Sequence, residues 1–198
     1  MRVDPVAPDE QALRAAVDVL RRGGLVAFPT ETFYGLGAAV LDRAAVRRVF
    51  EVKGRPASMP LLVLLDVAAN LSQLVDEVPE RARRLIDRYW PGPLTLVFRA
   101  AASVPGEITA GTGTIGVRVP NHAVPRALVA HLGVAVTAPS ANPTGAAPPS
   151  TADAVLAGLG DAVDLVLDGG PTPGGAPSTV VDVTVDPPRV VRQGAITL

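Results

Sequence analysis

Short apolar runs alternate along the chain with longer stretches in which apolar residues recur at helical spacing. The apolar runs have the length of strands and predict strands at residues 25–28, 61–65, 94–98, 115–119, 134–138, 165–168, 180–185 and 189–192. The periodic stretches predict helices over residues 9–22, 42–53, 79–89, 122–131 and 152–158. The run at 61–65 has no polar alternation, which is typical of a strand buried on both faces. The pattern therefore predicts an α/β protein.

Local signals mark where several of these helices begin and end. Asp9 is expected as the N-cap or as a first-turn acid of the first helix, and Asp42 as the N-cap of the second. Gly54 is expected to end the second helix, with Pro56 keeping it closed. The stretches at 29–37 and 104–114 are rich in Gly, Pro and Thr and are predicted to be loops.

Two of the predicted strands end alike. Residues 25–28 run into a proline followed by Thr-Glu-Thr, and residues 134–138 run into Pro-Ser-Ala-Asn. Open α/β sheets bind small ligands in the crevice beyond the strand ends. We therefore expect both ends to meet in one crevice, with Ser140 and Asn142 offering polar groups to phosphates.

The basic residues contain one clear outlier. The chain has 17 arginines and a single lysine, Lys53, which stands two positions before Arg55. A compact ammonium in an arginine-rich chain suggests a site that binds phosphate oxygens. The alternative is a lysine left by chance on a solvated face.

Other arginines invite two interpretations each. Arg118 lies between Val117 and Val119 in a predicted strand, so it is expected to be buried or to line a cleft, with either an anionic ligand or a structural Asp or Glu as its partner. The arginines of the helix at 79–89 indicate a solvated face rather than an RNA-binding stripe, because no aromatic residues are interleaved with them. Trp90, held in a rigid turn, is expected to plug the core.

Composition narrows the classes of function. The 198 residues suit one domain or at most two small ones, 48% of them are hydrophobic, and the mean hydropathy is +0.32. The chain has no cysteine, and His122 and His131 lack the spacing of metal ligands, so thiolate catalysis is excluded and a histidine metal centre is not expected. The net charge of −1 provides no global attraction to nucleic acid. No signal peptide and no membrane-spanning segment are recognised, and a cytoplasmic location is expected.

Seven motifs occur in a fixed order: PTETFYGLG, KGR, WPGPLTLV, GVRVP, APSAN, STVVDV and VRQGAI. Together they resemble the YrdC family of L-threonylcarbamoyladenylate synthases over nearly the whole chain. The resemblance implies an α/β fold with an open twisted mixed sheet, flanking helices and a central cleft, as a single catalytic domain over residues 1–198. It also implies a nucleotidyltransferase that forms threonylcarbamoyl-AMP and pyrophosphate from L-threonine, bicarbonate and ATP for tRNA modification.

In the implied mechanism the amine of threonine captures carbon dioxide or bicarbonate as a carbamate. A carbamate oxygen then attacks the α-phosphorus, and pyrophosphate leaves. Such a reaction depends mainly on positioning and charge neutralisation, so the site needs neither Cys nor a catalytic His.

The resemblance also assigns residues. Lys53 and Arg55 are expected to be catalytic, and ATP is expected to contact Lys53, Arg55, Thr114, Ser140, Asn142, Pro148 and Arg192. Threonine is expected to contact Thr32, Tyr34, Arg118, Ala138 and Ser178. Mg²⁺ is expected as a cofactor, with Glu31 the nearest candidate carboxylate and the ligands otherwise unassigned. Partners would be tRNA threonylcarbamoyl-transferase proteins, and weak binding of tRNA or RNA is left open.

Two positions depart from the family pattern. Many relatives carry asparagine where this chain has Met59 and histidine where it has Leu64, so one nucleotide contact and one threonine contact are in question. Two other functions remain open at this point. One is a carbamoyl-transferring domain of the same fold, and the other is an RNA-binding or ribosome-maturation module, whose binding would be tight and steeply dependent on salt.

Overall fold

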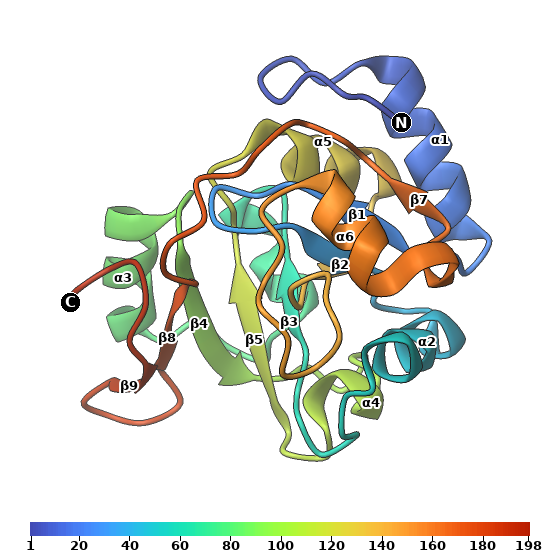
Figure 1. The fold of residues 1–198 in the computed structure, drawn as a ribbon. Helices are drawn as coiled ribbons and strands as arrows, with labels where there is room; N and C mark the ends of the chain where they lie inside the picture. Colours follow the sequence, from blue (N-terminus) through green and yellow to red (C-terminus); the bar gives the residue numbers. More distant parts are fainter.

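Two sheets form the framework of the protein, and the computed structural model describes all of residues 1–198 (Figure 1). The smaller sheet has the strand order β2-β1-β7, with β1 at Val26–Phe28, β2 at Gly35–Gly37 and β7 at Leu165–Val166. The larger sheet has the order β6-β3-β5-β4-β8-β9, with its strands at Val136–Thr137, Leu62–Leu64, Thr114–Arg118, Leu94–Arg99, Thr179–Asp182 and Arg189–Arg192 respectively. It is a mixed sheet, because β3 pairs with β5 in parallel while β4 pairs with β5 in antiparallel.

Six α-helices surround the two sheets (Figure 1). They span α1 Glu10–Arg21, α2 Arg43–Lys53, α3 Glu80–Tyr89, α4 Gly106–Thr109, α5 Ala123–Leu132 and α6 Ala152–Leu159, and short 3₁₀ helices lie at Ala68–Gln73 and Gly160–Ala162. None of the helices combines the length and the apolar character that crossing a bilayer requires. The open mixed α/β sheet flanked by helices is confirmed.

The second helix begins and ends as the sequence predicts. Oδ1 of Asp42 accepts hydrogen bonds from the backbone N–H groups of Ala44 and Ala45, both at 3.0 Å. Gly54 ends the helix in the left-handed conformation, with φ of +56°. Asp9 occupies the N-cap position of α1, but its side chain makes no capping bond and instead accepts from the N–H of Asp4. These caps fix α2 so that Lys53 emerges from its last turn.

Part of the segment predicted to be a loop at 29–37 is a strand. Gly35–Gly37 pairs in antiparallel with Val26–Phe28, and the hairpin between them carries Thr30 to Tyr34. Glycine has low strand propensity, so the sequence pattern does not reveal this strand. Its glycines face the ring of Phe28, where a Cβ on Gly37 would lie 2.7 Å from a ring carbon. The predicted loop at 104–114 was also wrong in part, since it contains α4 and the first residue of β5.

The core consists of two clusters of buried residues. The larger contains 34 residues and fills the space between the two sheets and the helices α2, α3 and α6. The smaller contains 14 residues and joins α1 and α5 to the opposite faces of β1 and β3. Trp90 is only partly buried and packs at the edge of the larger cluster. Its indole N–H donates to the carbonyl of Leu94 at 2.7 Å. On α3, Arg83, Arg84 and Arg88 are exposed, as expected for a solvated face.

Candidate active site

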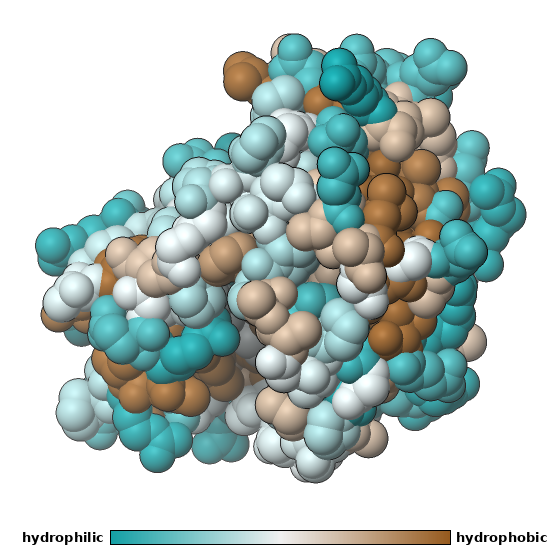
Figure 2. Space-filling view, viewed as in Figure 1, coloured by the Kyte–Doolittle hydropathy of each residue, from teal (hydrophilic) through white to brown (hydrophobic).

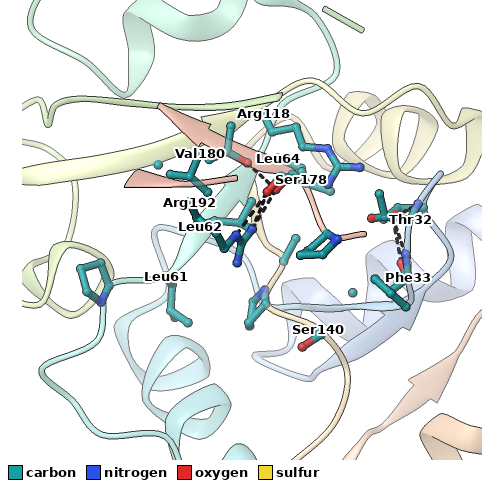
Figure 3. Close-up of a pocket in the computed structure, with 18 of the residues that line it drawn as sticks. Thr32, Phe33, Leu61, Leu62, Leu64, Arg118, Ser140, Ser178, Val180 and Arg192 are labelled. Atoms are coloured by element: carbon teal, nitrogen blue, oxygen red, sulfur yellow. Dashed lines mark hydrogen bonds between the residues drawn. The ribbon is translucent and has the colours of Figure 1, made fainter. Parts of the chain in front are cut away.

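A cleft of about 590 Å³ opens where the hairpin after β1 faces the larger sheet. Its walls come from the hairpin, β3, β5, β8, β9 and the segment after β6, and Figure 3 shows how the side chains converge on it. Figure 2 shows this face of the molecule hollowed between the part built around β8 and β9 and the part that carries the segment after β6. The expected crevice is therefore present.

The two strand ends that share the Pro-and-polar pattern do meet. Gly35 and Ser140 form an isolated antiparallel bridge, the N–H of Leu36 donates to the carbonyl of Pro139 at 2.8 Å, and the N–H of Ala141 donates to the carbonyl of Tyr34 at 2.9 Å. This backbone pairing joins the smaller sheet to the segment that follows β6. It places Ser140 on the floor of the cleft (Figure 3).

Lys53 lies beneath that segment rather than in the open cleft. The residue is 3% exposed, and its ammonium donates to the carbonyl oxygens of Ser140 and Asn142 at 2.5 Å each. Burial, and secondarily the nearby Arg55, lower the pKa of Lys53 to about 8. The two carbonyl contacts favour the charged form, so the ammonium is still protonated at pH 7. Lys53 thus anchors the turn that the family resemblance assigns to phosphate binding.

The remaining positions expected to bind nucleotide surround this turn. Arg55, Thr114, Ser140, Pro148 and Arg192 line the cleft, whereas Lys53 and Asn142 do not. The guanidinium of Arg55 donates to the carbonyls of Met59 and Pro60, at 3.2 and 2.8 Å, and burial lowers its pKa. Asn142 is buried, and its amide nitrogen closes its own loop through the carbonyls of Pro143 and Ala146.

Arg118 is buried, and it also lines the cleft. Its Nη2 lies 2.5 Å from Oε2 of Glu31, so the structural ion pair that the sequence left open is present. This contact does not have hydrogen-bond geometry, and the Nε of Arg118 has no partner at all. Burial lowers the pKa of Arg118, and Glu31 opposes that effect. A buried guanidinium with unused donors at a cleft wall can bind a carboxylate or phosphate.

A second guanidinium stands nearby on β9. Arg192 donates to the carbonyl of Ser178 at 2.8 Å and to its hydroxyl at 3.2 Å, as the dashed lines in Figure 3 show. Burial, followed by repulsion from Arg118, lowers the pKa of Arg192. The hydroxyl of Ser178 also lies 2.9 Å from that of Thr95 on β4, and Thr95 lines the cleft. The sequence analysis missed Thr95, although a hydroxyl inside the apolar strand of the WPGPLTLV motif is a usable signal.

The hairpin supplies the residues expected on the threonine side. Thr32 lines the cleft, and its hydroxyl lies 3.0 Å from that of Thr30, a second cleft residue that the sequence analysis did not single out. Tyr34 is fully buried, its hydroxyl donates to the carbonyl of Gly170 at 2.7 Å, and burial raises its pKa to about 12. Ala138 and Tyr34 both line the cleft, so the predicted wall role of Tyr34 fits its position.

The two carboxylates at the cleft, those of Glu31 and Asp182, are engaged by other groups of the protein. No group of three His, Asp or Glu side chains is arranged to hold a cation. Oε1 of Glu31 accepts from the N–H of Asn121 at 2.9 Å while Oε2 faces Arg118, so the geometry gives no support to the expectation that Glu31 binds magnesium. Asp182, the other cleft carboxylate, is held by Thr184 and Arg189.

Comparison with known proteins shows which family the chain belongs to. The family model named Sua5_yciO_yrdC, described as "Telomere recombination", matches residues 18–194. The chain belongs to this family.

Two relatives of this chain in the Sua5/YciO/YrdC family share the name threonylcarbamoyl-AMP synthase. The chain is 44% identical to a threonylcarbamoyl-AMP synthase of Pyrococcus abyssi over 96% of this chain and 56% of that protein. It is 38% identical to a threonylcarbamoyl-AMP synthase of Bacillus subtilis over 98% of this chain and 56% of that protein. It superposes with a TM-score of 0.94 and 42% identity on P. abyssi Sua5 complexed with L-threonine, covering 98% of this chain and 57% of that one. The chain thus spans little more than half the length of these Sua5/YciO/YrdC relatives.

The two positions expected to depart from the family pattern differ in burial and in whether they line the cleft. Leu64 is fully buried and lines the cleft, so an apolar side chain stands there. Met59 is 42% exposed and lies outside the cleft, where its carbonyl accepts from Arg55. Of these two positions only Leu64 lines the cleft, so it is the one at which the expected departure from the family pattern would affect the site.

Proposed function

We propose that this protein is a threonylcarbamoyl-AMP synthase, which joins L-threonine, bicarbonate and ATP to form threonylcarbamoyl-AMP and pyrophosphate. The observation that carries the proposal is the charge of the cleft. Three guanidiniums from separate elements, those of Arg55, Arg118 and Arg192, line one cleft above a buried ammonium, against only two acidic neighbours, Glu31 and Asp182. Such a cleft suits a triphosphate and a carboxylate together.

The nucleotide side of the proposed site is the end of the cleft near α2. Arg55, Thr114, Ser140 and Pro148 would surround the ATP there, with Arg192 reaching the ribose or phosphates. Each charge-assisted contact to a phosphate oxygen contributes about 1.5–3 kcal/mol. Lys53 would act first by holding the Ser140 turn in place, because its ammonium is committed to two carbonyls. Its positive charge still lies under the phosphates and favours their binding.

The amino-acid side is the wall formed by the hairpin and by β5 and β8. Arg118 would take the carboxylate of threonine, with Thr32 and Ser178 binding its polar groups and Tyr34 and Ala138 closing the pocket. In the proposed reaction the threonine amine and bicarbonate give a carbamate and water. A carbamate oxygen then bonds to the α-phosphorus as the bond to the leaving pyrophosphate breaks. The protein's part is to align the two substrates and to neutralise the charge that develops on the phosphates.

The wider context of the reaction is part of the proposal. The product would pass to transferase proteins that attach the threonylcarbamoyl group to tRNA in the cytoplasm. Magnesium would accompany the ATP phosphates and offset part of their negative charge. Weak binding of tRNA is compatible with the exposed arginines of α3 but is not required for the reaction.

Pyrophosphate release tests the proposal directly. The purified chain is incubated with ATP, L-threonine and bicarbonate, and each component is omitted in turn. We expect release to require all three, and we expect serine or valine to replace threonine only poorly. Release that continues without threonine would contradict the proposal. RNA that binds tightly, with a steep salt dependence and no competition from ATP, would instead support the RNA-binding function.

A further inference from the structure

Glu31 connects two walls of the cleft that are distant in sequence. It lies at the tip of the hairpin between β1 and β2, and its two carboxylate oxygens reach the last residue of β5 and the turn that follows that strand. Oε1 accepts from the N–H of Asn121 at 2.9 Å, and Oε2 lies 2.5 Å from Nη2 of Arg118. The Glu31 side chain is only 15% exposed, so water screens this contact weakly.

No other group in the protein fixes the guanidinium of Arg118. The guanidinium of Arg118 makes no hydrogen bond to any side chain or carbonyl, and its only close charged partner of opposite sign is Glu31. A positive neighbour, Arg192, repels it. In Figure 3 the Arg118 guanidinium is directed towards the side of the cleft that carries Thr32, which is the hairpin that also bears Glu31. The orientation of this arginine therefore depends on one carboxylate.

The remaining donors of Arg118 are left for a ligand. Glu31 lies against Nη2, and the Nε–H on the same edge of the guanidinium is buried without a partner, which leaves Nη1 as the other terminal donor. A planar guanidinium whose Nη2 is held by a carboxylate presents Nη1 in a fixed direction, which favours a carboxylate arriving from the cleft. If Arg118 were free, it would lose this preorganisation and its charge would lack compensation.

We propose that Glu31 is a positioning residue for the amino-acid substrate. By holding Arg118 through its charge, and by holding the hairpin to the β5–α5 turn through Asn121, it aligns the guanidinium with the hydroxyl of Thr32. This inference rests on the proposed function, in which Arg118 takes the carboxylate of threonine. It assigns to Glu31 a role in threonine affinity and none in the chemical step.

The test is Glu31→Gln, which keeps the size of the side chain and an acceptor for the Asn121 N–H while removing the charge. We expect the KM for threonine to rise at least tenfold, the KM for ATP to stay within about twofold, and kcat at saturating threonine to stay within about threefold. Glu107→Gln is the matched control, because the Glu107 carboxylate pairs with Arg43 and Arg47 outside the cleft. It should leave all three constants unchanged.

A double-mutant cycle separates positioning from a general structural effect. In an Arg118→Gln background, Glu31→Gln should change the KM for threonine by less than about twofold, because the group it acts through is gone. An unchanged threonine KM in the single variant would overturn the inference, and so would an equal loss in both backgrounds. If Glu31→Gln fails to fold, Glu31→Asp, which keeps the charge on a shorter side chain, should still raise the threonine KM several-fold.

The same measurements distinguish this inference from the proposed function. Wild-type protein whose pyrophosphate release ignores threonine would remove the proposed function itself. Wild-type protein that requires threonine, together with a Glu31→Gln variant that titrates threonine normally, would overturn only the role of Glu31.

Discussion

Replacing Lys53 with methionine tests the arrangement on which the nucleotide side of the cleft depends. Methionine has nearly the length of lysine but cannot donate to the carbonyls of Ser140 and Asn142. The buried turn then loses the ammonium that joins it to the end of α2. The cleft also loses a positive charge close to where the triphosphate would lie.

The effect on folding should be modest because two contributions oppose each other. Loss of two charge-assisted hydrogen bonds costs about 3–6 kcal/mol in total. Against this, burial and Arg55 lower the pKa of Lys53 from 10.5 to about 8, which corresponds to about 3 kcal/mol against the protonated form in the folded protein. The variant should therefore lose about 0–3 kcal/mol of unfolding free energy, which a domain of ordinary stability tolerates.

The effect on ATP use should be larger than the effect on folding. Loss of one charge-assisted contribution of about 1.5–3 kcal/mol corresponds to a fall of about 10- to 160-fold in kcat/KM for ATP. Pyrophosphate release measures this, and thermal unfolding of the same preparation checks the fold. Arg43→Met is the matched control, since Arg43 lies on the same helix and its partner, Glu107, lies outside the cleft. A folded Lys53→Met variant with kcat/KM for ATP within twofold of wild type would refute the reasoning.

Three further predictions address other parts of the structure. Thr95→Val removes the hydroxyl that lies 2.9 Å from the hydroxyl of Ser178, and it should raise the KM for threonine by about 3- to 10-fold in the pyrophosphate assay. An unchanged KM for threonine would show that Ser178 needs no such partner. Lys53 is required in its protonated form and has a pKa of about 8 in the free protein, so kcat/KM for ATP should fall as the pH rises through 8. The unfolding free energy should rise between pH 8 and 10.5, because the unfolded chain binds more protons than the folded protein in that range. A kcat/KM profile that stays flat up to pH 9.5 argues against this role of Lys53. Gly54→Ala places a side chain at φ of +56° and should cost about 1 kcal/mol, or about 2–4 °C in Tm, whereas Gly106→Ala, whose Cβ would meet nothing within 4 Å, should leave Tm unchanged.

The sequence predicted most of the framework, and what it missed has physical causes. Apolar runs and capping residues located α2 and all but one of the strands within a few residues, because burial and caps leave direct marks on the residue pattern. The strand Gly35–Gly37 was missed because its pairing is set by the contact of its glycines with Phe28, not by its own propensity. The short helix Gly106–Thr109 was missed because four residues carry no detectable period.

The site shows a similar division. The single lysine and the two Pro-and-polar strand ends pointed to the region in which the structure has its cleft, since both are visible in composition and local order. The direction in which Lys53 points was not predictable, because it depends on carbonyls nearly 90 residues away. For Arg118 the sequence offered a structural acid or an anionic ligand as alternatives. The structure shows the acid, Glu31, and also places Arg118 at the wall of a cleft with donors left unpartnered, so the two alternatives are not exclusive.

The place of Arg192 in the sheet has one more consequence. β9 pairs with β8 alone, and all four of its residues are exposed, yet from this outermost strand Arg192 reaches inward to the carbonyl and hydroxyl of Ser178. The least protected strand of the larger sheet thus carries part of the cleft wall. Fraying at this margin would withdraw a guanidinium and release a hydroxyl in the same event, so the integrity of the cleft is tied to the most easily opened hydrogen bonds of the fold.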